Sequence, residues 1–365
     1  MVKTKKMKTI ICISLLALCS CASDNDSKVP ESTLTESVVP RVKNYTSYFV
    51  GNKTDSKNKA IGGICLMGGA SENDEAMKWF LKRANGGDVL VLRTSGTDGY
   101  NSYLYFSLGV KVNSVETILF KNSAASSDSD ILVKIKKAEA IWFAGGDQWD
   151  YISYWRNSPV SKAINDAIAQ NSIVIGGTSA GMAIEGGFYF SAQKGTITSS
   201  EALQNPFDSK LTVSNELFLD NSILKNVITD THYDNPNRKG RHIAFIARII
   251  TDYGISAKGI ACDEYTSVCI DEKGIARIFG SYPAKEDVAY FIKPNTDIPN
   301  NKPELCSSNK ALEWNLDKKA ITVYEVKGTN DGKNTFNLNN WTEGNGGIWK
   351  NWYIENGALA ELIAL

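Results

Sequence analysis

The chain has 365 residues, of which 42% are hydrophobic, and its 40 basic residues balance 40 acidic ones. This length and apolar content allow a large buried core in one or two domains. A formal net charge of zero leaves no basic surface typical of nucleic-acid binding, so we exclude that class of partner.

The N-terminus has the features of an export signal. Residues 1–20 combine four early lysines with a short apolar segment over 9–18, which ends in small residues and Cys. The apolar segment is too short to span a bilayer comfortably. It resembles the lipobox of bacterial lipoproteins, which implies lipidation of Cys21 and an outer-membrane lipoprotein facing the periplasm or the cell surface. A plain signal peptide cut nearby is the alternative, and both predict export.

Three regions follow the leader. Residues 21–57 begin with the Cys whose lipidation the lipobox resemblance implies. They are rich in Ser, Asp, Asn and Thr without clear apolar periodicity, which indicates a flexible tether. Residues 58–293 alternate short apolar runs with helical stretches, the pattern of βαβ units and a parallel sheet covered on both faces. Residues 294–365 begin with an Asn- and Pro-rich link and hold four of the eight Trp. We predict a β-rich extension with these Trp in its core; an aromatic surface for glycan or peptide is the alternative.

Three of the predicted strands end in a pair of glycines. The pairs occupy residues 68–69, 145–146 and 176–177. In open α/β sheets the carboxyl ends of the strands form the crevice where ligands bind. We therefore expect the three pairs to converge around one site.

The third pair leads into the predicted nucleophile, Ser179. A Ser on a sharp turn between a buried strand and a helix needs small neighbours, and Gly177-x-Ser179-x-Gly181 supplies them. A plain strand-to-helix turn or a phosphate loop would show the same pattern. Ser179 needs a base, and the chain has only two His. We prefer His232, which follows a predicted strand, over His242, which lies within a predicted helix.

The remaining members of the site are less determined by the sequence. For the carboxylate that orients His232 we prefer Glu201, with Glu264 as runner-up and Asp230 and Glu185 also open. We expect the backbone amides of Ala180 and Gly146 to stabilise an oxyanion. Four side chains are expected to contact substrate, two of them Arg suited to carboxylates unless they form a solvated helix start: Gln148, Asp230, Arg238 and Arg241.

Several motifs, taken in order, resemble those of the cyanophycinase and peptidase E family of serine peptidases. They are Gly68-Gly69-Ala70, Gly145-Gly146-Asp147-Gln148, Gly176-Gly177-Thr178-Ser179-Ala180-Gly181, Asp230-Thr231-His232-Tyr233 and Gly259-Ile260-Ala261-Cys262-Asp263-Glu264. The resemblance covers about residues 60–292. It implies a flavodoxin-like, class I glutamine-amidotransferase-like three-layer α/β sandwich with a mostly parallel sheet. It also implies Ser179 as nucleophile, His232 as base and Gln148 against the aspartyl part of the substrate.

One family motif is only partly present. Cyanophycinases follow their His with an Arg-rich motif of the form R-x-R-x-x-R, and Arg238 and Arg241 match its last two positions. Pro236 stands where the first Arg would be. The surface that would hold a polymer therefore departs from the family pattern.

The sequence thus predicts an exported serine exopeptidase that acts on Asp-containing, including β-aspartyl, peptides. We expect no metal or other cofactor, since the mature chain has no C-x-x-C spacing, and we leave open a monomer or a homodimer. One alternative is an α/β-hydrolase-type esterase, which predicts an oxyanion motif of the HGGG type, although no His precedes Ser179. The other is a non-catalytic lipoprotein that binds peptide or glycan on the same scaffold.

Overall fold

The computed structural model describes residues 43–170 and 173–364. From Lys43 onward the chain forms a single compact unit. The predicted leader, Cys21 and most of the predicted tether lie outside the described residues. Across the described ranges, no helix is both long and apolar enough to cross a membrane.

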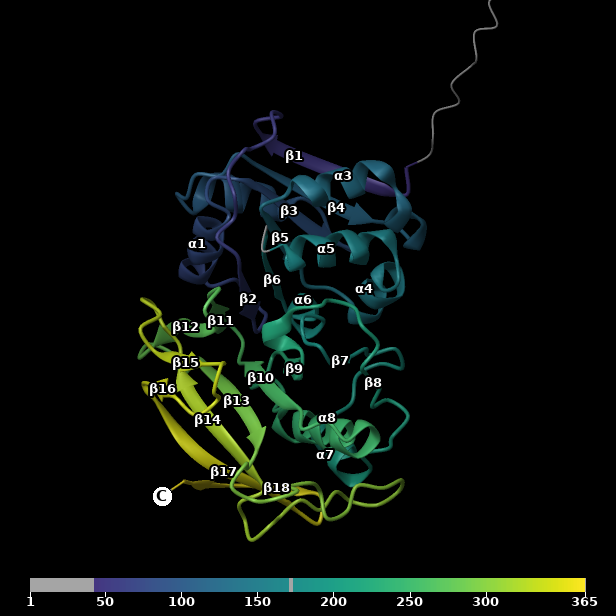
Figure 1. Ribbon diagram of the computed structural model, residues 1–365, viewed down its shortest axis with the longest axis vertical. Coiled ribbons are helices and arrows are strands. Elements are labelled where there is room, and N and C mark those ends of the chain that lie inside the picture. The colour runs from purple at the N-terminus through teal and green to yellow at the C-terminus, as the bar shows by residue number, and fades with distance from the viewer. Residues whose placement is uncertain (1–42, 171–172, 365) are drawn as a thin grey trace, which may run out of the picture. The chain divides into compact units, whose positions relative to one another are not determined.

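The larger of the two main sheets has ten strands in the order β1-β4-β3-β5-β6-β2-β11-β12-β15-β16 (Figure 1). The five strands β4-β3-β5-β6-β2 are parallel, and antiparallel strands extend the sheet on both sides. The predicted parallel sheet is therefore confirmed at its centre. The strands are β1 (Tyr45–Gly51), β2 (Gly63–Met67), β3 (Asp88–Arg93), β4 (Ser114–Phe120), β5 (Ala140–Phe143), β6 (Val174–Thr178), β11 (Ser267–Ile270), β12 (Ile275–Tyr282), β15 (Thr335–Asn337) and β16 (Gly344–Asn345).

Both faces of the parallel strands are buried, which explains their continuous apolar runs. In β2, Ile64 and Leu66 join one hydrophobic core, while Cys65 and Met67 join another on the opposite face. The predicted three-layer sandwich is therefore confirmed. The first core includes η2 (Ser123–Ser127), α3 (Ser129–Lys137), α4 (Gln148–Trp155) and α5 (Pro159–Ala169). The second includes α1 (Asp74–Arg83), α2 (Gly99–Ser102) and η1 (Tyr103–Ser107).

The predicted tether ends earlier than expected. Strand β1 pairs antiparallel with β4 along its whole length, from Tyr45 opposite Phe120 to Gly51 opposite Ser114. Its residues alternate between more and less buried positions, as an edge strand's do. The prediction of a tether through residue 57 is therefore wrong. The strand was missed because half of an edge strand is polar, so its alternation was hidden among neighbouring polar residues.

A second, six-stranded sheet has the order β18-β17-β14-β13-β10-β9. Its strands are β9 (Val227–Asp230), β10 (Lys258–Cys262), β13 (Val288–Pro294), β14 (Ile321–Lys327), β17 (Gly347–Glu355) and β18 (Ala358–Ile363). Strands beyond residue 294 extend this sheet, and β15 and β16 extend the first one. The β-rich C-terminal region is confirmed, and it shares both sheets with the preceding residues. The remaining elements are α6 (Ala180–Ala183), β7 (Tyr189–Phe190), α7 (Ser199–Gln204), β8 (Val213–Ser214), η3 (Ser222–Leu224) and α8 (Lys239–Tyr253).

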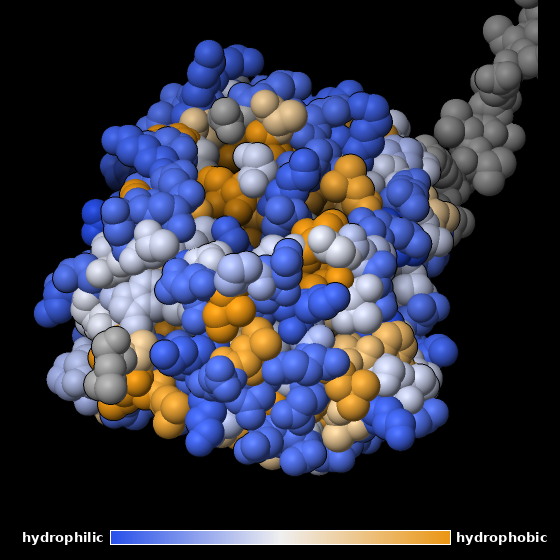
Figure 2. All heavy atoms as spheres, turned by 60° about the horizontal axis from the view of Figure 1, so that its bottom comes forward, coloured by the Kyte–Doolittle hydropathy of each residue, from blue (hydrophilic) through white to orange (hydrophobic). Residues whose placement is uncertain are grey.

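The Trp residues of the C-terminal region lie mainly in the core. Trp314, Trp341 and Trp352 are buried, and Trp349 is half-buried against Tyr324 and Phe336. Figure 2 shows one face of the molecule, on which hydrophobic side chains form separate small groups among hydrophilic ones. The interpretation of these Trp as core residues is confirmed, and the alternative of an aromatic binding surface is wrong for the three buried ones.

Candidate active site

Ser179 stands at the sharp turn between β6 and α6. Its backbone adopts φ 55° and ψ −119°, a conformation that costs free energy for a residue with a side chain. Both flanking glycines are required by close packing: a Cβ on Gly177 would lie 2.6 Å from the carbonyl carbon of Gly181, and one on Gly181 would lie 2.1 Å from the carbonyl oxygen of Phe143. The predicted nucleophile turn is therefore present.

His232 lies beside Ser179, as predicted. The Ser179 Oγ and the His232 Nε2 are 2.8 Å apart, within hydrogen-bonding distance. The backbone N–H of His232 donates to the carbonyl of Gly68 at 2.7 Å, and a Cβ on Gly69 would lie 2.4 Å from His232 Nε2. A Cβ on Gly145 would lie 3.6 Å from the Ser179 Cβ. The three Gly-Gly strand ends thus converge on one site.

The carboxylate that contacts His232 is Glu264. Its Oε1 lies 2.7 Å from His232 Nδ1, on the side of the imidazole that faces away from Ser179. The hydrogen bond with His232 holds the pKa of Glu264 below its usual value. An ionised carboxylate only accepts hydrogen bonds, so Nδ1 carries the proton and Nε2 is free to accept one from Ser179. The backbone N–H of Glu264 is itself fixed by the Asp234 side chain at 2.9 Å.

The preference for Glu201 is wrong. Glu201 lies in the first turn of α7, where it accepts hydrogen bonds from Thr198 and Lys210. The hydrogen bond from Lys210, followed by those from Thr198, lowers its pKa to about 2. Its place between Ser179 and His232 in the chain suggested the triad role, but the glutamate caps a helix at the surface.

Two other carboxylates that the sequence left open also lie away from the imidazole. Glu185 is fully buried, and neither of its carboxylate oxygens has a hydrogen-bond partner among the described residues. Burial raises the pKa of Glu185 well above its usual value. Asp230 is buried against Arg241, whose Nε donates to Asp230 Oδ2 at 2.8 Å. The prediction that Asp230 and Arg241 contact substrate is wrong, because the two side chains neutralise each other.

The other predicted substrate contacts are engaged by the protein. The Gln148 amide donates to the carbonyl of Phe190 at 2.9 Å, and Arg238 donates to the carbonyl of Thr231 at 3.0 Å. Gly146 packs beside the Tyr151 hydroxyl. None of Gln148, Arg238 and Gly146 lines the cavity at Ser179. Their roles, and that of the Ala180 amide, stay predictions.

A cavity of about 670 Å³ opens at Ser179 and His232, and we call it the Ser179 cavity. Its remaining walls come from the segment before α1, the end of β3, and α2 with η1. Sequence reasoning missed these charged and aromatic walls. The signal was available for Arg93, since it directly follows the apolar run of residues 89–92 and so belongs at the same sheet edge as the Gly-Gly pairs. The residues missed are Glu72, Asp74, Arg93, Tyr100 and Tyr103.

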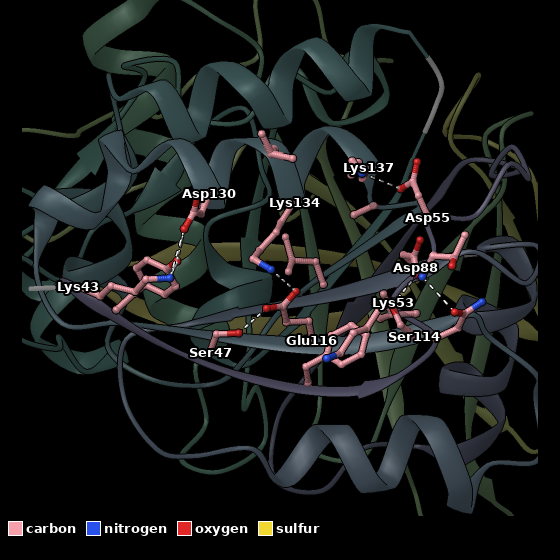
Figure 3. A pocket seen from close by; sticks show the side chains of 18 residues that line it. Lys43, Ser47, Lys53, Asp55, Asp88, Ser114, Glu116, Asp130, Lys134 and Lys137 are labelled. Carbon is pink, nitrogen blue, oxygen red and sulfur yellow. Dashed lines mark hydrogen bonds and ion pairs between the residues drawn. The ribbon is translucent and has the colours of Figure 1, made fainter. Parts of the chain in front are cut away.

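A second cavity, of about 400 Å³, lies between β1 and α3, and we call it the β1–α3 cavity (Figure 3). Six of its charged side chains form ion pairs with one another. These are Lys43 with Asp130, Lys134 with Glu116, and Lys137 with Asp55. In the part of the chain that the structure describes, no cluster of His, Cys, Asp and Glu is arranged to hold a metal ion.

Comparison with known proteins supports a peptidase family for this chain. The model of Peptidase family S51 matches residues 99–278, which include Ser179, His232 and Glu264. The match covers 180 of the 365 residues, just under half of the chain. Together with the cyanophycinases among its relatives, it supports a cyanophycinase and peptidase E-like family. The chain is a peptidase, a serine hydrolase, with the flavodoxin-like, class I glutamine-amidotransferase-like fold expected from its motifs. The alternative of a non-catalytic binding lipoprotein is therefore set aside.

The individual relatives are distant in sequence. The cyanophycinases of Synechococcus elongatus and Thermosynechococcus vestitus are each 24% identical to this chain over 269 residues, which is 69% of this chain and 77% of theirs. The crystal structure of a peptidase from an acI-B1 Actinobacterium matches 61% of this chain and 89% of its own, with a TM-score of 0.46 and 16% identity.

Proposed function

We propose that this peptidase is a cyanophycinase-type exopeptidase that hydrolyses Asp-containing peptides, including β-aspartyl ones. The observation that carries the proposal is the hydrogen-bonded series Ser179, His232 and Glu264 at the mouth of the Ser179 cavity. The class of substrate is supported by the ordered motifs of the sequence and by the cyanophycinases among its relatives.

The first half of the reaction forms an acyl-enzyme. His232 Nε2 accepts the proton of Ser179 Oγ as this oxygen attacks the scissile carbonyl carbon. Glu264 holds the imidazole ring in place and stabilises its positive charge. The imidazolium then donates the proton to the leaving amine as the C–N bond breaks, and the Ser179 ester remains.

The second half releases the product with water. His232 takes a proton from a water molecule, which attacks the ester carbonyl, and returns the proton to Ser179 Oγ as the C–O bond breaks. Each tetrahedral intermediate carries a negative oxygen that needs backbone donors. The Ala180 amide, in the residue after the nucleophile, is the proposed first donor.

We also propose that the protein is exported and held at the outer membrane through Cys21. The lysine-rich N-terminus, its short apolar segment and the Cys at its end support this assignment. Incorporation of labelled fatty acid into the wild-type protein, and its loss in Cys21→Ser, would test it. Export of an unlabelled wild-type protein would instead favour a plain signal peptide.

Reaction with a fluorophosphonate, followed by peptide mapping, tests the proposed nucleophile. We expect the label on Ser179 of the wild type, none in Ser179→Ala, and much slower labelling in His232→Ala. Unchanged labelling in both variants would contradict the proposal. Aspartyl peptides with free and acetylated amino termini then test exopeptidase action from the amino end, which requires the free amino terminus. Preferential hydrolysis of short acyl esters would favour the esterase alternative.

A further inference from the structure

Arg93 is a cation without a carboxylate partner inside the Ser179 cavity. It ends β3, and its Nη1 donates to the carbonyl of Thr97 at 2.6 Å while its Nε donates to the carbonyl of Ser95. The chain bends around the guanidinium at Gly96, which has φ 83° and where a Cβ would lie 2.1 Å from Arg93 Nη2. Among residues 43–170 and 173–364, no acidic side chain forms an ion pair with Arg93.

The other charged walls of this cavity are acidic. The Tyr100 hydroxyl donates to Glu72, and the Tyr103 hydroxyl donates to Asp74 at 2.7 Å. The Arg93 Cζ lies 5.9 Å from the centre of the Tyr100 ring. Tyr100 therefore contacts the cation with its ring and an anion with its hydroxyl. The cavity has a positive end at the end of β3 and a negative end at the start of α1.

The remaining arginines of the predicted substrate site do not offer an equivalent charge. Arg241 is buried in its ion pair with Asp230, and Arg238 lies outside the cavity lining. A substrate carboxylate that enters the cavity is repelled by Glu72 and Asp74 and attracted by Arg93. Guanidinium groups bind carboxylates through two parallel hydrogen bonds, which fixes orientation as well as charge.

We propose that Arg93 is the specificity-determining residue that binds the free carboxylate of the substrate's acidic residue. The assignment rests on the proposed peptidase function and names the side chain that selects the substrate. An N-terminal Asp and a β-linked Asp each carry one free carboxylate and one ammonium group. Both fit the charge polarity of the cavity, with the carboxylate at Arg93 and the ammonium group toward Glu72 and Asp74.

The test compares matched peptides that begin with Asp, with β-linked Asp, or with Asn, which replaces the carboxylate by an amide of similar shape. We expect the full chain to show kcat/KM roughly 100-fold or more higher for one or both acidic peptides than for Asn. Arg93→Gln should remove most of this ratio, and Arg93→Lys should keep part of it through its charge. Arg277→Gln, an exposed arginine outside the Ser179 cavity, should keep the wild-type ratio.

Labelling of Ser179 by a fluorophosphonate, which carries no carboxylate, shows whether each variant keeps a working nucleophile. Wild-type labelling together with a lost ratio in Arg93→Gln would support the assignment. Turnover with an unchanged ratio in Arg93→Gln, or a wild type that does not prefer acidic peptides, would overturn the assignment alone. A wild type that neither labels nor hydrolyses any peptide would overturn the proposed function and the assignment with it. Hydrolysis of the Asp peptide, the β-linked Asp peptide or both shows which peptide linkage the enzyme cleaves.

Discussion

The Ser179 cavity and the β1–α3 cavity both contain acids, cations and a serine, yet their charges are arranged differently. In the β1–α3 cavity, Lys134 and Glu116 are paired at 2.7 Å, and the Ser47 hydroxyl donates to the same glutamate. In the Ser179 cavity, the serine contacts an imidazole, and Arg93 lacks an acidic partner among the described residues. Charges that neutralise each other maintain the local structure, whereas an unpaired charge beside a nucleophile leaves its counter-charge to a ligand.

The largest difference in kcat should appear between substitutions of the two serines, Ser179 and Ser47. Ser179→Ala removes the nucleophile and should lower kcat for aspartyl peptides by about 10⁵–10⁶-fold. Ser47→Ala removes only a hydroxyl that donates to Glu116, so its kcat should stay within about twofold of wild type. Steady-state hydrolysis by both variants measures this contrast, and comparable losses in the two would contradict it.

The next difference separates two glutamates that the sequence could not distinguish. Glu264→Gln removes the ion that orients His232 and should lower kcat by about 10³–10⁴-fold. Glu201→Gln affects only the first turn of α7 and should change kcat less than twofold. Circular dichroism of both variants checks that each is folded. A larger kinetic loss in Glu201→Gln than in Glu264→Gln would reverse the assignment.

A smaller effect, on the pH dependence of stability, is expected from one buried acid near each cavity. Burial raises the pKa of Asp263, next to Glu264, to about 7, and it raises the pKa of Glu139, which accepts from the Asp88 backbone, to about 7. Between the usual carboxyl pKa and about 7 the folded state binds more protons than the unfolded state, so stability falls as pH rises through this range. We expect Asp263→Asn and Glu139→Gln each to flatten this fall, measured as Tm between pH 4 and 8.

Only one of these two acids directly precedes a residue of the active site in the chain. The Asp263 carboxylate accepts from the backbone N–H of Val288 and follows β10 directly before Glu264. We therefore expect Asp263→Asn to lower kcat several-fold, while Glu139→Gln leaves kcat unchanged. Equal kinetic effects of the two substitutions would contradict this distinction, whatever their effects on Tm.

The smallest effect is expected from the paired charges themselves. Glu116→Gln removes the partner of Lys134 and should lower the free energy of unfolding by about 1 kcal/mol, since both side chains are partly exposed. Its kcat and its preference for acidic peptides should equal those of the wild type. Denaturant unfolding and peptide hydrolysis measure the two quantities. A lost preference in this variant would mean that the β1–α3 cavity also influences substrate selection.

The sequence alone determined the features that depend on neighbouring residues. The spacing of Gly177, Ser179 and Gly181 indicates a tight nucleophile turn, because a Ser on a sharp strand-to-helix turn needs small neighbours. The scarcity of His left two candidates, and the position after a predicted strand favoured His232. The alternation of apolar runs and helices predicted a parallel sheet covered on both faces. Each of these inferences needed only a short segment or a repeated local pattern.

Only the tertiary structure decided which distant side chains meet. Parallel pairing of β9 with β10 brings His232 and Glu264 together across 32 positions, and the same fold pairs Asp230 with Arg241. The sheet edge likewise carries Arg93 to the Ser179 cavity. These choices depend on strand order and register, which a single sequence does not specify, because many carboxylates and cations occur at strand ends and pairing selects among them.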